Sequence, residues 1–463
     1  MSPPIDSVNF DFSVPNDVAY TSDTTTSAVS ASTFVSTCPG ASKTLLVSST
    51  SYGFDFSTTC SSGAFKLYML TSVADTADEA LELLSSHASD PPSSFAAACE
   101  DAATLFSRAF DPANSVFSGN LPSMTSNDPA LDALFVWSAT AQLSLMRTSM
   151  ASFPRQYVIS EGASNSLDGS AGMGGAGQFV WDLSFSAVTL ALLDPDAAMA
   201  IATHVVANSE FGSHPIGVPQ AWDAFPSYPN VVGGGQYAFD FLASFIYIKS
   251  LVTNSRTGFA FLTTPIKNNH DGLDYTPLDF LKRIATHMED YPRSVASPYL
   301  VDYGSDKRSF LEAAPTYTNV IAGLQAGNAG MMLSLASLLE TMDVEAPLVD
   351  SLRTNATHIV DAIVKFQYIE GGYFACLNAT EGYDPVEVMA LADHVYVGMS
   401  LGVLGEQSDL LPDSVRDSMS EFFFTDYLSG NGWIRALSLR DGSMSELNCD
   451  PQLCSDTAKV SMR

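Results

Sequence analysis

The sequence predicts a mainly α-helical protein whose paired helices close into a ring, preceded by a small β-rich region. Beyond residue 90, about ten segments carry apolar residues at the 3.6-residue period of a helix. No strands alternate with these segments, which excludes a doubly wound sheet. The sequence has no short repeat of fixed length, so a regular solenoid is disfavoured. The first 90 residues instead carry short aromatic and apolar runs bounded by Ser, Thr and Gly.

The β-rich region is expected over residues 1–90, with runs such as Leu45 to Val47, Tyr52 to Phe56 and Phe65 to Leu70. A polar stretch containing Pro91 and Pro92 ends it. A single helical domain is then expected over residues 91–463. Its predicted helices cover residues 94–110, 128–149, 179–193, 195–209, 236–253, 276–290, 316–341, 345–367, 385–404 and 411–428.

The composition narrows the classes of partner. The chain has 463 residues and a net charge of −31, a field that repels the phosphates of nucleic acids but tolerates a neutral glycan. No apolar run is long enough for a membrane span. Asn355 and Asn378 each begin a glycosylation triplet, so we expect a secreted glycoprotein whose signal peptide is missing from this sequence.

The six cysteines show neither a CxxC motif nor clustering with histidine, so no zinc site is expected. Two pairs are close enough in sequence to form disulfides, Cys38 with Cys60 and Cys449 with Cys454. For Cys99 and Cys376, an isolated buried thiol is about as well supported as a disulfide.

Several stretches in order along residues 95–445 resemble the six-hairpin glycosidases, the clan of processing α-glucosidases (glycoside hydrolase family 63) and trehalases. The Gly-rich stretch from Gly174 to Phe185, with its Trp-Asp pair, is similar to a loop of that clan. Further similar stretches run from Ser126 to Leu131, from Tyr299 to Gly304 and onward from Trp433. The resemblance implies an (α/α)6 toroid behind an N-terminal β-region, a carbohydrate substrate and no cofactor.

Glycoside hydrolysis needs two carboxyl groups, one protonated and one ionised. The loop resemblance makes Asp302 the candidate acid, because the neighbouring Tyr299 and Tyr303 would raise its pKa; a solvated loop residue or a helix cap is an equal alternative. Asp290 is the second choice, since no predicted helix follows it at the right distance. Glu312 could bind sugar hydroxyls or act only as a charge at a helix start.

Aromatic and amide side chains on the loops are the candidates for binding the sugar. Trp181 and Asp182 could form a stacking platform with a carboxylate beside it, or a buried tryptophan with a helix cap. Further lining residues are expected among Trp222, Gln236, Tyr237, Tyr303 and Tyr373, for which turn chemistry is a comparable explanation.

The second carboxylate is expected late in the chain, where Glu446 and Asp450 are the candidates, although the pattern of the clan is absent around them. The helix count is also about two short of the twelve that six hairpins require, so the toroid is expected to lack part of its last hairpin. Either the gene model is truncated or the barrel is open.

The resulting expectation is an inverting hydrolase of an α-linked glycan or small glucoside. The alternative is a catalytically impaired barrel that binds carbohydrate. Epimerase or lyase chemistry is least favoured, because the seven histidines show no acid/base pairing. No oligomeric state follows from the sequence.

Overall fold

The computed structural model describes residues 10–14, 29–36, 45–46, 52–56, 67–74, 77–111, 117, 121, 124–140, 143, 146–148, 155–157, 189–213, 216, 234–254, 258–304, 318–378, 382–387, 393, 397–398, 401 and 410–428. These residues are mainly helical. They fall into two compact units, one formed largely by residues 1–148 and the other largely by residues 178–463. No helix in the described part of the chain is long and apolar enough to cross a membrane.

The first unit begins with antiparallel strands. β1 (Phe10–Val14) pairs with β4 (Tyr52–Phe56), and β2 (Val29–Ser36) lies between β3 (Leu45–Leu46) and β5 (Leu67–Ala74). Three of these strands coincide with the apolar runs that the sequence shows.

Helices follow the strands in the same unit: α1 (Ala77–Ala88), α2 (Pro91–Ala109) and α3 (Pro129–Thr140). α2 begins where Asp90 accepts a hydrogen bond from the Ser93 amide and proline occupies the first helical position, where a missing N–H costs nothing. The helix predicted over 128–149 is wrong near its end, because β6 (Met146–Thr148) pairs with β7 (Arg155–Tyr157) and cross-strand pairing overrides local periodicity. Cys99 is a free thiol but is exposed on α2, which differs from the isolated buried thiol that the sequence left open as one alternative.

The second unit is built around two helices that are buried on all sides. α6 (Gly234–Asn254) buries every residue from Phe241 to Ile248, and α8 (Ala322–Thr341) buries every residue from Ala322 to Ala336. A helix that is apolar all round requires neighbours on all sides. α6 accordingly packs against α5 (Pro195–Asn208), α7 (Pro277–Ala285) and α8.

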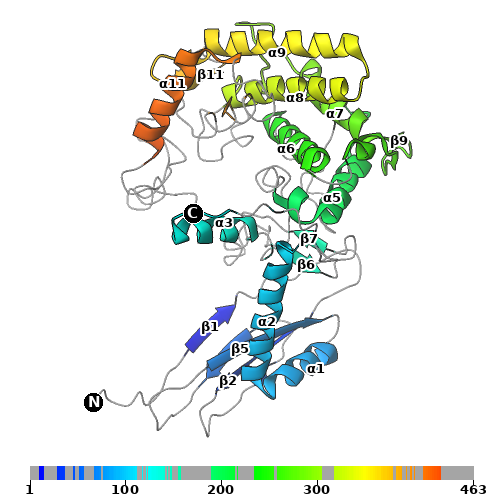
Figure 1. Ribbon diagram of the computed structural model, residues 1–463, viewed down its shortest axis with the longest axis vertical. Helices are drawn as coiled ribbons and strands as arrows, with labels where there is room; N and C mark the ends of the chain where they lie inside the picture. The colour runs from blue at the N-terminus through cyan, green and yellow to red at the C-terminus, as the bar shows by residue number, and fades with distance from the viewer. Residues whose placement is uncertain are drawn as a thin grey trace. The chain divides into compact units, whose positions relative to one another are not determined.

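The helices around this pair are amphipathic. α9 (Ala346–Phe366) buries Val349, Leu352, Ala356 and Ile359 at helical spacing, and Figure 1 shows it lying alongside α8. α7 starts with a capping box between Thr276 and Asp279. Buried and amphipathic helices therefore alternate along the chain from α5 to α9, as in a two-layered arrangement of hairpins. Closure into a ring stays a prediction.

Short elements connect the helices of the second unit. They are η3 (Gly258–Thr263), the hairpin of β8 (Ile266–Lys267) with β9 (Asp274–Tyr275), η4 (His287–Asp290), the sheet of β10 (Tyr368–Ile369), β11 (Tyr373–Asn378) and β12 (Asp384–Glu387), α11 (Asp413–Phe422), and η8 (Phe423–Tyr427).

The helix predicted over 385–404 is wrong at its start, because Val386 pairs with Cys376 in the β11–β12 ladder. The helix predicted from residue 316 begins only at Ala322, because Val320 pairs with Leu377. Cys376 is a buried free thiol, one of the two alternatives that the sequence left open.

Candidate functional site

Asp302 lies on a segment, residues 300–304, that is extended around Val301, where it pairs with Arg293, and that approaches the first turns of α8. Side chains alternate along extended backbone, so Val301 and Tyr303 point into the core and are 0% and 3% exposed, while Asp302 is half-buried. The side chain of Gln325 on α8 holds this segment in register. Its Oε1 accepts from the Val301 amide and its Nε2 donates to the Val301 carbonyl, both at 3.0 Å.

The Asp302 carboxylate is surrounded by donors. Oδ1 accepts from the Gly304 amide at 2.8 Å and from Asn319 Nδ2 at 2.9 Å, and Oδ2 accepts from the Tyr383 hydroxyl at 2.7 Å. A carboxylate accepts hydrogen bonds at both oxygens, and these three neighbours supply donors to both. The three donor residues all have left-handed backbone, with φ of 89°, 62° and 64° respectively. The carboxylate therefore joins three turns from separate parts of the chain.

The contact with Asp302 also changes the chemistry of Tyr383. The hydrogen bond to Asp302, followed by desolvation, raises the pKa of Tyr383 to about 12. At neutral pH its hydroxyl is therefore a stable donor beside a half-exposed carboxylate.

Tyr303 faces the opposite way from Asp302, into the interior. Its hydroxyl accepts from Asn328 Nδ2 at 2.7 Å and lies 3.3 Å from His287 Nε2. Burial raises the pKa of Tyr303 and lowers the pKa of His287 to about 4. The aromatic neighbours that the sequence suggested for Asp302 are thus elsewhere, since Tyr299 packs against the His358 ring. Asn319 and Tyr383 take their place.

Two further candidates lie in other surroundings. Asp290 forms an ion pair with Arg283 at 2.7 Å. Tyr373 is 7% exposed and packs its ring against Phe422, with ring centroids 5.2 Å apart, in a cluster that includes Tyr427. The structure does not bring either of them to the Asp302 carboxylate.

Most of the remaining candidates lie outside the described residues: Trp181, Asp182, Trp222, Glu312, Glu446 and Asp450. The same holds for the cysteine pairs Cys38 and Cys60, and Cys449 and Cys454. Gln236 and Tyr237 lie in the first turn of α6, where only the backbone is described. Among the residues that the structure does describe, no group of three or more His, Cys, Asp or Glu side chains could hold a metal ion.

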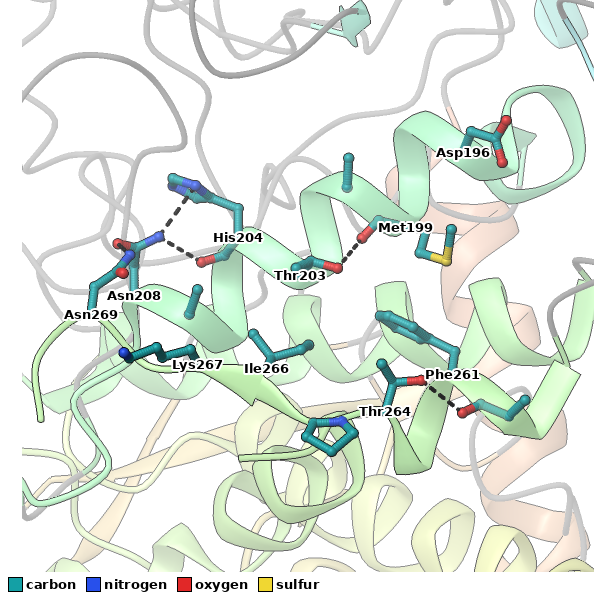
Figure 2. Close-up of a pocket in the computed structure, with 14 residues that line it drawn as sticks. Asp196, Met199, Thr203, His204, Asn208, Phe261, Thr264, Ile266, Lys267 and Asn269 are labelled. Atoms are coloured by element: carbon teal, nitrogen blue, oxygen red, sulfur yellow. Dashed lines mark hydrogen bonds between the residues drawn. The ribbon is translucent and has the colours of Figure 1, made fainter. Parts of the chain in front are cut away.

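A groove of about 870 Å³ lies elsewhere on the second unit, between α5 and the segment of η3 and β8 (Figure 2). Several of its polar side chains are used within the protein: Thr203 and Thr264 donate to helical carbonyls, and Asn269 donates to Asn208 Oδ1 at 2.9 Å. Its only acidic lining residue in the described part of the chain is Asp196. The groove therefore lacks the paired carboxyl groups of a hydrolase.

Sequence reasoning missed the residues that define the Asp302 site. Asn319, Gln325, Asn328 and Tyr383 carry no local motif, and their roles depend on contacts distant in sequence. One signal was available: Gly382 before Tyr383 is typical of a tight turn, and its φ is 71°.

No protein-family model matches the chain, and the comparison with curated proteins gave no match. Among solved structures, the chain is similar to a rhamnosidase from Klebsiella oxytoca with rhamnose bound. The TM-score is 0.45 and the sequence identity is 14%, over 91% of this chain and 71% of that chain. A TM-score below 0.5 does not establish a shared fold, so the proposals below depend on the geometry of this chain.

Proposed function

We propose that this chain is a glycoside hydrolase acting on an α-linked glycan or small glucoside, with Asp302 as one of two catalytic carboxyl groups. The observation that supports the proposal is the position of the Asp302 carboxylate and its three hydrogen-bond donors. Asp302 is half-buried, fixed by three donors, and follows Val301, which Gln325 in the first turns of the buried helix α8 holds by two hydrogen bonds. A fixed carboxylate with access to solvent is a basic requirement of this chemistry.

The surroundings of Asp302 favour the ionised role in the pair. The sequence assigned Asp302 to the acid, which must hold a proton, but donors on both oxygens stabilise a carboxylate that only accepts. In the proposed mechanism Asp302 activates the attacking water. The proton donor is then Glu446 or Asp450, which the sequence places late in the chain. An inverting reaction requires the two carboxyl groups to be about 6.5–9.5 Å apart, with water between them.

A catalytically impaired carbohydrate-binding barrel is the second candidate function. One observation favours it: the same three hydrogen bonds tie Gly304, Asn319 and Tyr383 together, so a structural role is sufficient to account for Asp302. In this alternative the sugar is bound through loop residues such as Trp181 and Asp182 and is not cleaved.

The experiment that tests the proposal is hydrolysis of a panel of α- and β-aryl glycosides by the full chain, with proton NMR to identify the anomer released. Asp302→Asn keeps the size of the side chain but removes its negative charge. We expect kcat to fall by about 10²–10⁴-fold, the usual contribution of general acid–base catalysis. Asp350→Asn, an isosteric change at an exposed position of α9, is the matched control and should leave kcat unchanged.

The outcomes separate the two candidates. Full activity in Asp302→Asn overturns the assignment of that residue. Glycan binding by the unmodified chain without turnover supports the carbohydrate-binding alternative. Neither binding nor turnover across the panel overturns both. Circular dichroism of each variant shows whether a loss of activity reflects a loss of folding.

A further inference from the structure

Three polar side chains form a continuous buried chain behind Asp302. They come from three elements: His287 from η4, Tyr303 from the segment 300–304, and Asn328 from α8. Their exposed fractions are 0%, 3% and 1%. We call these three residues the buried chain. Burial of this many polar atoms together is costly unless they are matched to one another.

The hydrogen bonds of the buried chain have a defined direction. His287 Nδ1 lies 2.6 Å from the Ile284 carbonyl, which can only accept, so this nitrogen carries the ring proton. In the neutral ring Nε2 is therefore the acceptor, and the Tyr303 hydroxyl donates to it. Asn328 Nδ2 in turn donates to the Tyr303 oxygen. In this arrangement Tyr303 donates to a neutral His287, and the burial of the ring favours the neutral form.

The buried chain anchors the segment that carries Asp302. Tyr303 directly follows Asp302 in the chain and contacts Asn328 on α8. Asn328 lies one turn after Gln325, which hydrogen-bonds to Val301. Two amide side chains on one face of α8 thus hold residues 301 and 303. Gln325 does not titrate, whereas the contact through Tyr303 depends on the charge of His287.

The surroundings of His287 include aromatic rings from α6 and from the segment after η4, and charged groups from α7, η4 and that segment. The Phe241 ring on α6 lies 4.6 Å from the His287 ring, centroid to centroid, and Tyr291 and Tyr303 lie on the following segment. Burial is the largest cause of its lowered pKa, and the positive charges of Arg283 and Arg293 lower it further. The Ile284 carbonyl and the negative charge of Asp290 act in the opposite direction but do not compensate.

We propose that the buried chain of His287, Tyr303 and Asn328 is an acid-sensitive latch that holds the Asp302 segment against α8 at neutral pH and releases it in acid. Protonation places a hydrogen on Nε2, so the contact with Tyr303 must reverse its direction, and a positive charge is buried in a core that also carries the charges of Arg283 and Arg293. Opening of the segment lets water solvate the imidazolium. The latch is a property of the fold and does not depend on the proposed hydrolase activity.

The size of the effect follows from the two protonation equilibria of His287. Its pKa is about 4 in the closed state, against about 6.5 when solvated, so lowering the pH from about 7 to 4 should raise the opening equilibrium roughly 100-fold. The carboxylates of the protein also take up protons in this range. The latch is therefore measured by comparison with a variant that lacks the histidine.

The experiment is hydrogen exchange with mass spectrometry on the full chain between about pH 7 and 4, corrected for the intrinsic exchange rate. The reporter is the peptide with the amides of residues 301–304, and α9 peptides report global unfolding. His287→Gln keeps an acceptor for Tyr303 without the titrating ring. His204→Gln is the matched control, because burial also lowers the pKa of His204, which lies on α5 and is not part of the buried chain.

We expect exchange at 301–304 to rise with acid in the unmodified chain and in His204→Gln, ahead of exchange in α9. In His287→Gln the rise should be several-fold smaller, whatever the absolute stability of that variant. An equal rise in His287→Gln and the unmodified chain overturns the proposal. So does exchange that rises together at 301–304 and in α9, which indicates global unfolding. Because no activity is measured, failure of the latch is distinct from failure of the proposed function.

Discussion

The turn between β10 and β11 offers a stability test in which two adjacent glycines act as each other's control. Gly371 and Gly372 both have positive φ, 125° and 93°. A Cβ added at Gly372 would lie 2.6 Å from the carbonyl carbon of Ser418 and 3.0 Å from Phe422 Cβ, both on α11. A Cβ added at Gly371 would meet only the Tyr373 ring, at an ordinary contact distance of 3.8 Å.

The expected magnitude has two parts. A side chain in this region of backbone space costs about 1–3 kcal/mol of unfolding free energy at either glycine. At Gly372 the α11 backbone must also move away, which loosens the packing of Phe422 and Tyr427 against Tyr373. Complete loss of a buried aromatic side chain costs about 3–5 kcal/mol, so a partial shift should cost about 2 kcal/mol more. We expect Gly372→Ala to destabilise the protein by about 3–5 kcal/mol.

Thermal denaturation of the two variants under identical conditions measures the difference. At about 1–2 °C per kcal/mol for a cooperative unit of this size, Gly372→Ala should melt roughly 2–4 °C below Gly371→Ala. Peptides from α11 should also lose protection from hydrogen exchange in Gly372→Ala alone. Equal melting temperatures for the two variants would refute the reasoning, because they would mean that α11 does not pack against this turn as described.

Three further predictions concern the Asp302 segment and α8. Tyr303→Phe removes the hydroxyl of the buried chain and should cost about 1–3 kcal/mol in urea denaturation. Asp393→Ala removes the acceptor of the Gly323 amide in the first turn of α8 and should cost about 1–2 kcal/mol by the same measurement. The raised pKa of Tyr383 means that its contact with Asp302 stabilises the fold below about pH 10 and is lost as the pH rises through about 12. The stability difference between the unmodified chain and Tyr383→Phe should therefore shrink over that range, and a constant difference would contradict this.

The helices were the most predictable part of the structure. α5, α6 and α9 begin and end within two residues of their predicted bounds, because apolar period and caps such as Asp194 are local signals. The strands β6 and β12 were assigned to helices, although their partners β7 and β11 are only a short loop away, because helical periodicity in the single segment does not show strand pairing. The alternation that places Val301 and Tyr303 inside is also a local property, but it was not recognised for so short a segment.

By itself the sequence determined that this is a mainly helical chain with an acidic surface and an N-terminal β-region, since composition and periodicity are properties of neighbouring residues. Only the tertiary structure decided the surroundings of Asp302. Its donors Asn319 and Tyr383 lie 17 and 81 residues away, and they reach it because α8 and the β11–β12 turn meet there. The sequence predicted aromatic neighbours around Asp302, but folding brings hydrogen-bond donors there. The charge state that a carboxylate prefers depends on these neighbouring atoms, and they are set by the tertiary structure.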